Sequence, residues 1–308
     1  MKKIKIINGL VYRFKMILQY FRYLMNFVIP FNNYAIIEPF GRIGNNLQQI
    51  ALGSLFSNSK KLNFFYSEDE LLEEFSLINN SFHEKFKFFK KKYNFYFYES
   101  KNEVFKIFPL QDISEDFIYQ NIELTFKEIL KPNLKFLKKL DISDDVLVIH
   151  IRSGDIFEKN KYPGYVQNPV SYYLPLIQKY KECLIVTEQK RNNPVIPYLL
   201  KYDNVKIQSL DKFTDFNTIY SAKNLATSGV GTFPIAAALL STNLKNFYYS
   251  NYFLTEHLNP NMLRNKKVNH FKLEILNYIP HNKWENSEDN LKKMVSDDVE
   301  VVLPDNFN

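Results

Sequence analysis

From residue 145 to residue 249 the chain alternates short apolar runs with longer segments whose apolar residues recur every three or four positions. Short apolar runs predict buried strands, and the longer spacing predicts helices between them. Strands joined by helices are typical of right-handed crossovers, which build a parallel sheet. The alternation therefore predicts an α/β fold whose ligand binds at the carboxyl ends of the strands. The expected strands are residues 146–151, 184–187, 205–208, 224–227 and 246–249, and the expected helices are 169–180, 194–200, 215–221 and 233–240.

The 308 residues are enough for two domains of ordinary size. A second strand, loop and helix unit is expected near the amino end, with its strand at 34–38 and its helix at 47–56. We place the boundary between the domains near residues 140–145, where the regular alternation begins. The chain then divides into a basic amphipathic amino-terminal segment (1–33), a first domain (34–142), a second domain (143–280) and a polar peripheral tail (281–308).

Almost all of the net positive charge is concentrated at the amino end. The sequence has 40 Lys and Arg against 33 Asp and Glu, a formal charge of +7, but residues 1–37 carry +6 of it and contain no acid. The rest of the chain is nearly balanced, which is no electrostatic footprint for a polyanion. No nucleic-acid partner is therefore expected.

Residues 1–30 combine these cations with many apolar and aromatic residues, and residues 9–28 have helical spacing. Such a helix could lie on an anionic membrane surface or pack on the protein itself. It is not expected to span a membrane, because Arg13, Lys15 and Arg22 interrupt the run of roughly 18 apolar residues that a span requires. We expect a cytoplasmic protein, with peripheral contact to the inner membrane face if this helix binds lipid.

Two further features limit the kinds of site that the chain can hold. Cys183 is the single cysteine, and no Cys and His cluster has metal-ligand spacing, so neither an intramolecular disulfide nor a metal site is expected. Residues 82–98 mix Lys with Phe and Tyr, a composition that could stack on single-stranded nucleic acid. In a chain with 16% aromatic residues, an amphipathic core element explains this stretch better.

Glycine is rare in this chain, with 8 residues in 308, under half of the usual frequency of about 7%. In a chain with so few glycines, those that occur are expected where the backbone needs a positive φ or approaches a ligand closely. Gly41, Gly44, Gly154, Gly229 and Gly231 fall in three short motifs. We name these motifs the GRIGNN turn (residues 41–46), the arginine motif HIRSGD (150–155) and the SGVGTF loop (228–233).

The arginine motif begins at the carboxyl end of the first strand of the alternating region. Arg152 is permanently charged and can hold phosphate oxygens with two parallel hydrogen bonds. Gly154 allows a tight turn, and Asp155 could orient the arginine or accept a substrate hydroxyl. His150 could bind a phosphate or hold the loop. The simpler alternative is an Arg152 to Asp155 pair that only stiffens a turn.

The SGVGTF loop lies where a strand is followed by a helix that is expected to begin at Pro234. Free N–H groups at a helix N-terminus bind anions, and the hydroxyls of Ser228 and Thr232 are within reach. Alternatively, Thr232 is only the N-cap of the helix. Together with Arg152 at the same sheet edge, the loop predicts a clamp for a diphosphate.

The GRIGNN turn occupies the equivalent strand-to-helix position of the first domain, but it matches neither the dinucleotide fingerprint nor the Walker loop. Arg42 and Asn45 are expected to point toward the space between the domains. The alternative is a tight turn in which Asn45 caps the following helix.

Several carboxylates near these motifs are candidates for acid-base chemistry or for contacts to a nucleotide. Glu38 precedes the GRIGNN turn, and Glu38, Asp155 or His150 could accept the proton of a substrate hydroxyl. Glu188 follows a predicted strand and Asp215 opens a predicted helix, and each could contact ribose or base, or cap a helix.

Three stretches of the chain resemble one known family. EPFGRIGNNLQQIALG (38–53) resembles the amino-terminal glycine-rich motif of the α-1,2-fucosyltransferases and protein O-fucosyltransferases, and VIHIRSGDIF (148–157) matches their H-x-R-x-G-D motif. DFNTIYSAKNLATSGVGTFPIAAALLS (215–241) is similar to their carboxyl-terminal motif. The order and spacing agree over residues 34–250, and the arginine motif is the specific match of the three.

The resemblance implies a GT-B fold, in which two Rossmann-like domains face a central cleft. The first domain would approach the acceptor and the second would hold the nucleotide-sugar donor, with no metal and no other cofactor. Arg152 would bind the donor β-phosphate, and Asn45 would assist at that phosphate or at the glycosidic oxygen. The phosphate and base site would be lined by Ser228, Thr232 and Phe233. YVQNPVSYY (165–173) could shape a donor or acceptor pocket, or begin a helix capped by Asn168.

The resemblance thus predicts an inverting, metal-independent glycosyltransferase that moves a sugar from a GDP-sugar to a glycan or lipid-linked glycan. Fucose is the first candidate for that sugar. The acceptor would belong to a bacterial surface glycan such as a capsule, lipooligosaccharide or O-antigen. One alternative keeps the fold and changes the donor to GDP-heptose or another nucleotide sugar. Another is a non-catalytic module that binds glycan, phosphate or nucleic acid.

Overall fold

The computed structural model describes residues 34–37, 42–59, 63–66, 114–158, 162–255 and 257–307. The basic amino-terminal segment, Glu38, Gly41 and residues 82–98 lie outside the described residues, so the expectations for them stay predictions. Within the described ranges, no helix combines the length and the apolar character that crossing a bilayer demands.

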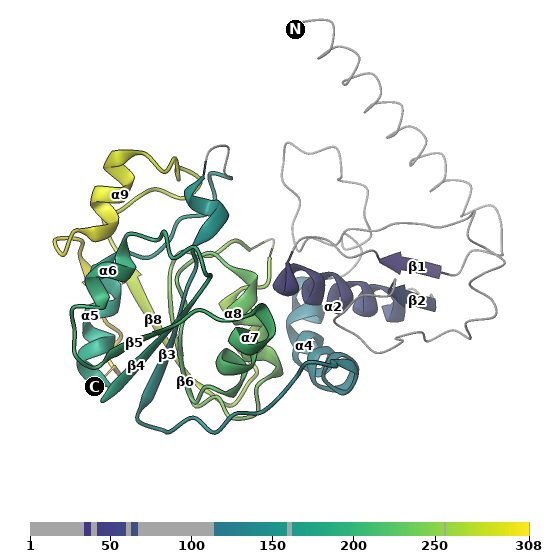
Figure 1. The fold of residues 1–308 in the computed structure, drawn as a ribbon. Helices are drawn as coiled ribbons and strands as arrows, with labels where there is room; N and C mark the ends of the chain where they lie inside the picture. The colour runs from purple at the N-terminus through teal and green to yellow at the C-terminus, as the bar shows by residue number, and fades with distance from the viewer. Residues whose placement is uncertain are drawn as a thin grey trace, which may run out of the picture.

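The second half of the chain forms a seven-stranded sheet with the order β5-β4-β3-β6-β7-β8-β9 (Figure 1). Within this sheet the strands from β3 to β8 pair in parallel, and β9 is antiparallel to β8. The order reverses between β3 and β6, as in Rossmann-like sheets, which bind ligands at the carboxyl ends of the strands beside the reversal. The strands are β3 (Val146–Ile151), β4 (Glu182–Thr187), β5 (Val205–Gln208), β6 (Asn224–Ala226), β7 (Asn246–Ser250), β8 (Asn269–Ile275) and β9 (Val301–Val302).

Helices cover both faces of this sheet, because alternate side chains of a strand point to opposite faces. Val148 and Phe247 belong to one apolar cluster, and their neighbours Leu147, Ile149 and Tyr248 belong to another. The first cluster includes α7 (Lys212–Ser221) and α8 (Thr232–Leu240), and the second includes α5 (Val170–Lys179), α6 (Val195–Leu199) and α9 (Glu288–Val295).

The α/β class and the parallel strands agree with the alternation seen in the sequence. Three helix starts differ from the expected ones by a single residue, and α7 differs by three, since it begins at Lys212 and not at Asp215. The reason is a different N-cap: the carboxylate of Asp211 accepts hydrogen bonds from the N–H groups of Phe213 and Thr214, at 3.0 and 3.1 Å. Asp215 therefore lies inside the helix.

The described residues between 34 and 142 pack directly on the seven-stranded unit (Figure 1). β1 (Tyr34–Ile37), α2 (Ile43–Ser59) and β2 (Asn63–Tyr66) form a β-α-β unit with parallel strands. α2 and α4 (Glu115–Thr125), together with the helical turns that follow α4, share the apolar cluster of α7 and α8. The arrangement of two Rossmann-like domains around a cleft stays a prediction.

Residues 281–308, expected to be a peripheral tail, instead contribute to the second apolar cluster. Trp284 is 1% exposed, and Met294 of α9 is fully buried. The indole Nε1 of Trp284 donates to the carbonyl of Ile156 at 2.9 Å, and β9 extends the sheet beyond β8. The polar composition of this segment hid a few apolar residues at the positions that face the core.

α2 approaches α8 closely at Gly44. An added Cβ at Gly44 would lie 2.5 Å from Oγ1 of Thr232 and 2.6 Å from the backbone nitrogen of Phe233. Backbone contacts this short can be relieved only by moving one helix away from the other. Gly44 thus allows close contact between two helices, and its φ is not among the positive values.

We expect Gly44→Ala to lower the free energy of unfolding by about 2 kcal/mol, the usual cost of overpacking. Alanine is more favourable than glycine inside a helix by up to about 1 kcal/mol. Helix propensity alone would therefore raise the free energy of unfolding, opposite to the expected decrease. Denaturant unfolding measures the change. Gly231→Ser is the control, because the nearest atom to an added Cβ there is 3.9 Å away; equal stability of both variants would contradict the close contact.

Candidate functional site

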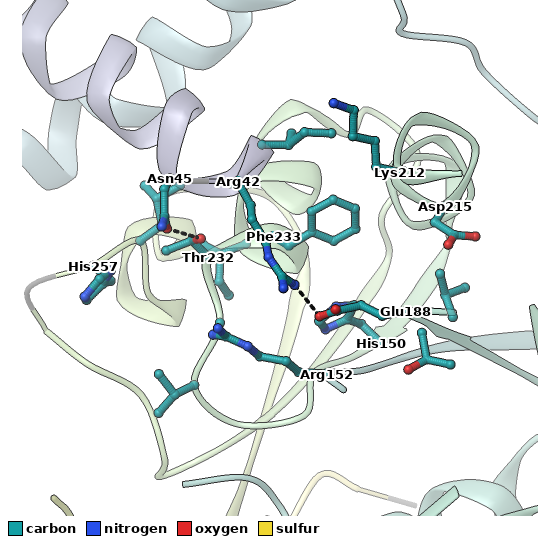
Figure 2. Close-up of a pocket in the computed structure, with 18 of the residues that line it drawn as sticks. Arg42, Asn45, His150, Arg152, Glu188, Lys212, Asp215, Thr232, Phe233 and His257 are labelled. Carbon is teal, nitrogen blue, oxygen red and sulfur yellow. Dashed lines mark hydrogen bonds and ion pairs between the residues drawn. The ribbon is translucent and has the colours of Figure 1, made fainter. Parts of the chain in front are cut away.

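A pocket of about 560 Å³ opens at the carboxyl ends of the strands beside the reversal of the sheet order. Figure 2 shows that α2, α8 and the ends of the strands all send side chains into it. Most of the site residues predicted from the sequence line this one pocket: Arg42, Asn45, His150, Arg152, Glu188, Asp215, Gly229, Gly231, Thr232 and Phe233.

Three predicted residues do not line the pocket but lie next to residues that do. Ser228 is 1% exposed, and its hydroxyl accepts a hydrogen bond from the N–H of Arg152 at 3.2 Å. Gly154 has a φ of +78°, and an added Cβ would lie 2.3 Å from Oε2 of Glu188. Asp155 pairs with arginines and does not line the pocket. Ser228 and Gly154 therefore support residues of the pocket, and the half-exposed Asp155 pairs with its arginines.

Arg152 is held from three directions. Its guanidinium lies over the ring of Tyr165, 4.3 Å from the centroid, and its Nη2 is 3.4 Å from Oδ1 of Asp155. Its carbonyl accepts a hydrogen bond from Nδ2 of Asn193 at 2.9 Å. The side chain is 16% exposed, so most of it is shielded from bulk solvent. Such a positioned, mostly buried cation is suited to bind phosphate oxygens.

Arg42 carries a second positive charge from α2 to the sheet edge. Its Nη1 lies 2.5 Å from Oε1 of Glu188, and its Nη2 lies 3.5 Å from Oδ1 of Asp155. Burial raises the pKa of Glu188 more than the neighbouring Arg42 lowers it. Burial lowers the pKa of Arg42, but Glu188 outweighs this effect, so that pKa is raised. Because Asp155 contacts both Arg42 and Arg152, the two arginines share one carboxylate.

The N-termini of α2 and α8 meet at this pocket. The hydroxyl of Thr232 donates to Oδ1 of Asn45 at 2.8 Å, which joins the first turns of the two helices (Figure 2). Asn45 is the third residue of α2 and not its cap, and the N-cap of α8 is Gly231 and not Thr232. Pro234 is accordingly the third residue of α8 and not the first. The N-terminal ends of two helices thus line one pocket, and the positive potential of helix N-termini favours an anion there.

Gly229 gives the SGVGTF loop its shape. Its φ is +101°, and an added Cβ would lie 2.9 Å from the carbonyl of Val166. Asn168 does not cap α5 but stays buried beside the loop, where its Nδ2 donates to the carbonyl of Thr227 at 3.0 Å. The run at residues 165–173 thus supports the loop from below and supplies Tyr165 to the pocket.

Two histidines line the pocket in neutral form. Burial, together with the charge of Arg152, lowers the pKa of His150 to about 3 and that of His257 to about 4. His150 is 7% exposed, and its Nδ1 has no hydrogen-bond partner within the described part of the chain. Its ring packs near that of Phe233, with the centroids 5.5 Å apart.

Asp215 lines the pocket, but its carboxylate is already bonded. It accepts hydrogen bonds from the N–H of Leu210 at 3.1 Å and from Nε2 of Gln208 at 2.9 Å. Burial raises its pKa. Asp215 therefore holds the turn between β5 and α7. In the ranges that the structure covers, no group of three or more His, Cys, Asp or Glu side chains could hold a metal ion.

The sequence did not indicate His257, Lys212 or Phe253, which also line the pocket. Lys212 follows the carboxyl end of β5, so the position of the strand end could have suggested it. His257 and Phe253 lie in a loop after β7 that no motif marks. Neither the family models nor the curated proteins compared with this chain give a match.

The two neutral histidines predict a pH dependence of stability. Their folded pKa values lie below the unfolded value of about 6.5, so unfolding takes up protons as the pH falls through this range. The contribution of these histidines to the free energy of unfolding should therefore be complete above pH ~6.5. It should decrease toward pH ~4, by up to about 1.4 kcal/mol per pH unit for each histidine. Denaturant unfolding at several pH values measures this slope.

His150→Gln removes one of these groups and should make the slope shallower, whatever it does to stability at neutral pH. His281→Gln is the control, because His281 is exposed and lies outside the pocket lining. An unchanged slope in His150→Gln would show that His150 is not held neutral.

Proposed function

We propose that this protein is a glycosyltransferase that transfers a sugar from a nucleotide-sugar donor to a hydroxyl of a bacterial surface glycan. The donor that we propose first is GDP-fucose. The observation that carries the proposal is the convergence of Arg152 and the N-termini of α2 and α8 on one pocket. The arginine motif, which gives the specific resemblance to fucosyltransferases, contributes His150 and Arg152 to that pocket.

The chemistry of a sugar diphosphate matches this pocket. When the bond between sugar C1 and the β-phosphate oxygen breaks, negative charge grows on the leaving diphosphate. Preorganised positive charge at that point lowers the barrier. Arg152 is held by Tyr165 and Asp155 before any ligand arrives, so little reorganisation is needed. We propose no metal ion for this step, because the arginine and the helix ends can supply the positive potential.

Asn45 fits a role beside the same phosphate. Its Oδ1 accepts the hydroxyl of Thr232, which orients the amide so that its Nδ2 is the group that can donate to a ligand oxygen. A donor at this place could bind a phosphate oxygen or the oxygen between the sugar and the phosphate. In this way α2 would bring the first domain into the transfer step.

The guanine nucleotide, the fucosyl group and the inverting course follow from the resemblance of the three motifs. Glu188, directly after β4, and Lys212, the first residue of α7, line the same pocket, and we propose that they contact the ribose and the base. The acceptor would be a glycan or lipid-linked glycan at the cytoplasmic face of the inner membrane. The +6 charge of residues 1–37 favours such a surface.

We expect GDP to stabilise the protein against heat, and UDP and a single-stranded oligonucleotide to give no shift. At a concentration 100 times its Kd, GDP should add about 2.7 kcal/mol to the free energy of unfolding. Differential scanning fluorimetry measures the shift. Stabilisation by the oligonucleotide alone would argue for the binding-module alternative, and no shift with any nucleotide would refute the donor assignment.

Arg152→Ala should lower transfer by about 10²- to 10³-fold, the usual effect of removing one charge-stabilising donor. Arg264→Ala is a matched control, because Arg264 lies 4.3 Å from the ring centroid of Tyr119 and pairs with Asp116 outside the pocket. The Arg264→Ala variant also loses a contact between a guanidinium and a tyrosine ring, and it should keep full transfer activity. Full activity of a folded Arg152→Ala variant would refute the role of Arg152.

A further inference from the structure

One short segment of the chain contacts each of the three residues that follow β3. This segment consists of the last residue of β4 and the loop before α6, residues 187–194, and we name it the asparagine loop. It belongs to none of the three motifs, and Glu188 is the one residue of it that the sequence indicated. The contacts of the asparagine loop with residues 152–154 are side-chain hydrogen bonds, and they are specific for position.

Asn193 holds the backbone of Arg152. Its Nδ2 donates to the carbonyl of Arg152 at 2.9 Å, and its Oδ1 accepts the N–H of Val195 at 3.0 Å. Asn193 is 1% exposed. Because the oxygen of the amide is engaged at the start of α6, the nitrogen must face Arg152. Asn193 therefore ties the position of Arg152 to the position of a helix.

Asn192 holds both backbone polar groups of Gly154. Its Oδ1 accepts the N–H of Gly154 at 2.6 Å, and its Nδ2 donates to the carbonyl of Gly154 at 3.2 Å. Gly154 has a φ of +78°, and a glycine populates negative φ just as readily. The two hydrogen bonds select one of these conformations. Between the two asparagine contacts, the hydroxyl of Thr187 donates to Oγ of Ser153 at 3.0 Å.

These contacts determine where the guanidinium of Arg152 lies. The N–H of Arg152 donates to Oγ of Ser228, so its backbone is held from the SGVGTF loop as well as from the asparagine loop. Asp155, which lies 3.4 Å from the guanidinium, follows Gly154 directly, so the turn at Gly154 places this partner. Neither Asn192 nor Asn193 lines the pocket. Any effect that they have on a ligand must therefore pass through the arginine motif.

Resting on the proposed function, we propose that Asn192 and Asn193 are positioning residues of the transfer, which hold Arg152 in place for the donor diphosphate before the donor binds. Stabilisation of a growing charge depends on groups that are already oriented. The asparagine loop also carries Glu188, for which we propose a contact to the ribose or the base. One loop would thus set the separation between the phosphate site and the nucleoside site.

The test measures kcat/KM for the donor sugar in Asn192→Ala and in Asn193→Ala. We expect each variant to lose transfer by up to about 10²-fold, the effect of a displacement of about 1 Å at a reacting group. Asn192 is half-buried, so Asn192→Ala serves if the variant of the buried Asn193 does not fold.

Asn204→Ala is the matched control for a purely structural effect. Nδ2 of Asn204 donates to the carbonyls of Ile177 and Tyr180 at 3.0 and 2.9 Å, and Asn204 lies outside the pocket lining. This variant also loses backbone hydrogen bonds of an asparagine, and denaturant unfolding measures what that loss costs in stability. Asn204→Ala should keep wild-type kcat/KM.

A double-mutant cycle tests whether the asparagines act through Arg152. When Arg152 is already alanine, Asn192→Ala and Asn193→Ala should lower the residual transfer no further, because the group that they position is gone. Their cost in stability should stay the same in both backgrounds. An equal loss of transfer with and without Arg152 would overturn the inference.

The outcomes separate this inference from the proposed function. If the wild type neither binds GDP nor transfers sugar, the proposed function is wrong and the inference that rests on it is wrong too. If the wild type does both, and the Asn192 and Asn193 variants transfer sugar as well as Asn204→Ala, the function stands and the positioning role is refuted.

Discussion

The contact between the first turn of α2 and the first turn of α8 is the constraint on which the site depends. Gly44 permits it, since any side chain there would meet the backbone of Thr232 and Phe233. The hydrogen bond from Thr232 to Asn45 then fixes the rotation of one helix against the other. Without this contact, Arg42 and Asn45 would not reach the edge of a sheet formed by residues far along the chain.

The charges of the site depend on one another. Two arginines from different parts of the fold share Asp155, and Glu188 neutralises the more exposed of them. This leaves Arg152, which is mostly buried and stacked on Tyr165, as the cation most ready to meet an anion. Its charge also helps to keep His150 and His257 neutral. A change at Arg152 would therefore alter the state of both imidazoles.

The sequence predicted those features that local patterns determine. Alternating apolar runs indicated the parallel sheet, and the rare glycines indicated the loops at its edge, because strand periodicity and positive φ are properties of a few adjacent residues. His257 could not be found in this way, since its place depends on a hydrogen bond between Leu258 and Gln48, 210 positions apart. The burial of Trp284 was missed because the segment around it is polar in composition. Helix caps were misplaced where two capping residues competed, as with Asp211 and Asp215.

The carboxyl-terminal segment also supports the arginine motif. Trp284 bonds the carbonyl of Ile156, and Nδ2 of Asn286 donates to the carbonyl of Phe157 at 2.9 Å. Because a ribosome makes the chain from its amino end, residues 154–157 emerge well before Trp284 and Asn286. Residues 154–157 therefore acquire this support only after all the parallel strands have been synthesised, which orders the assembly of the site during translation.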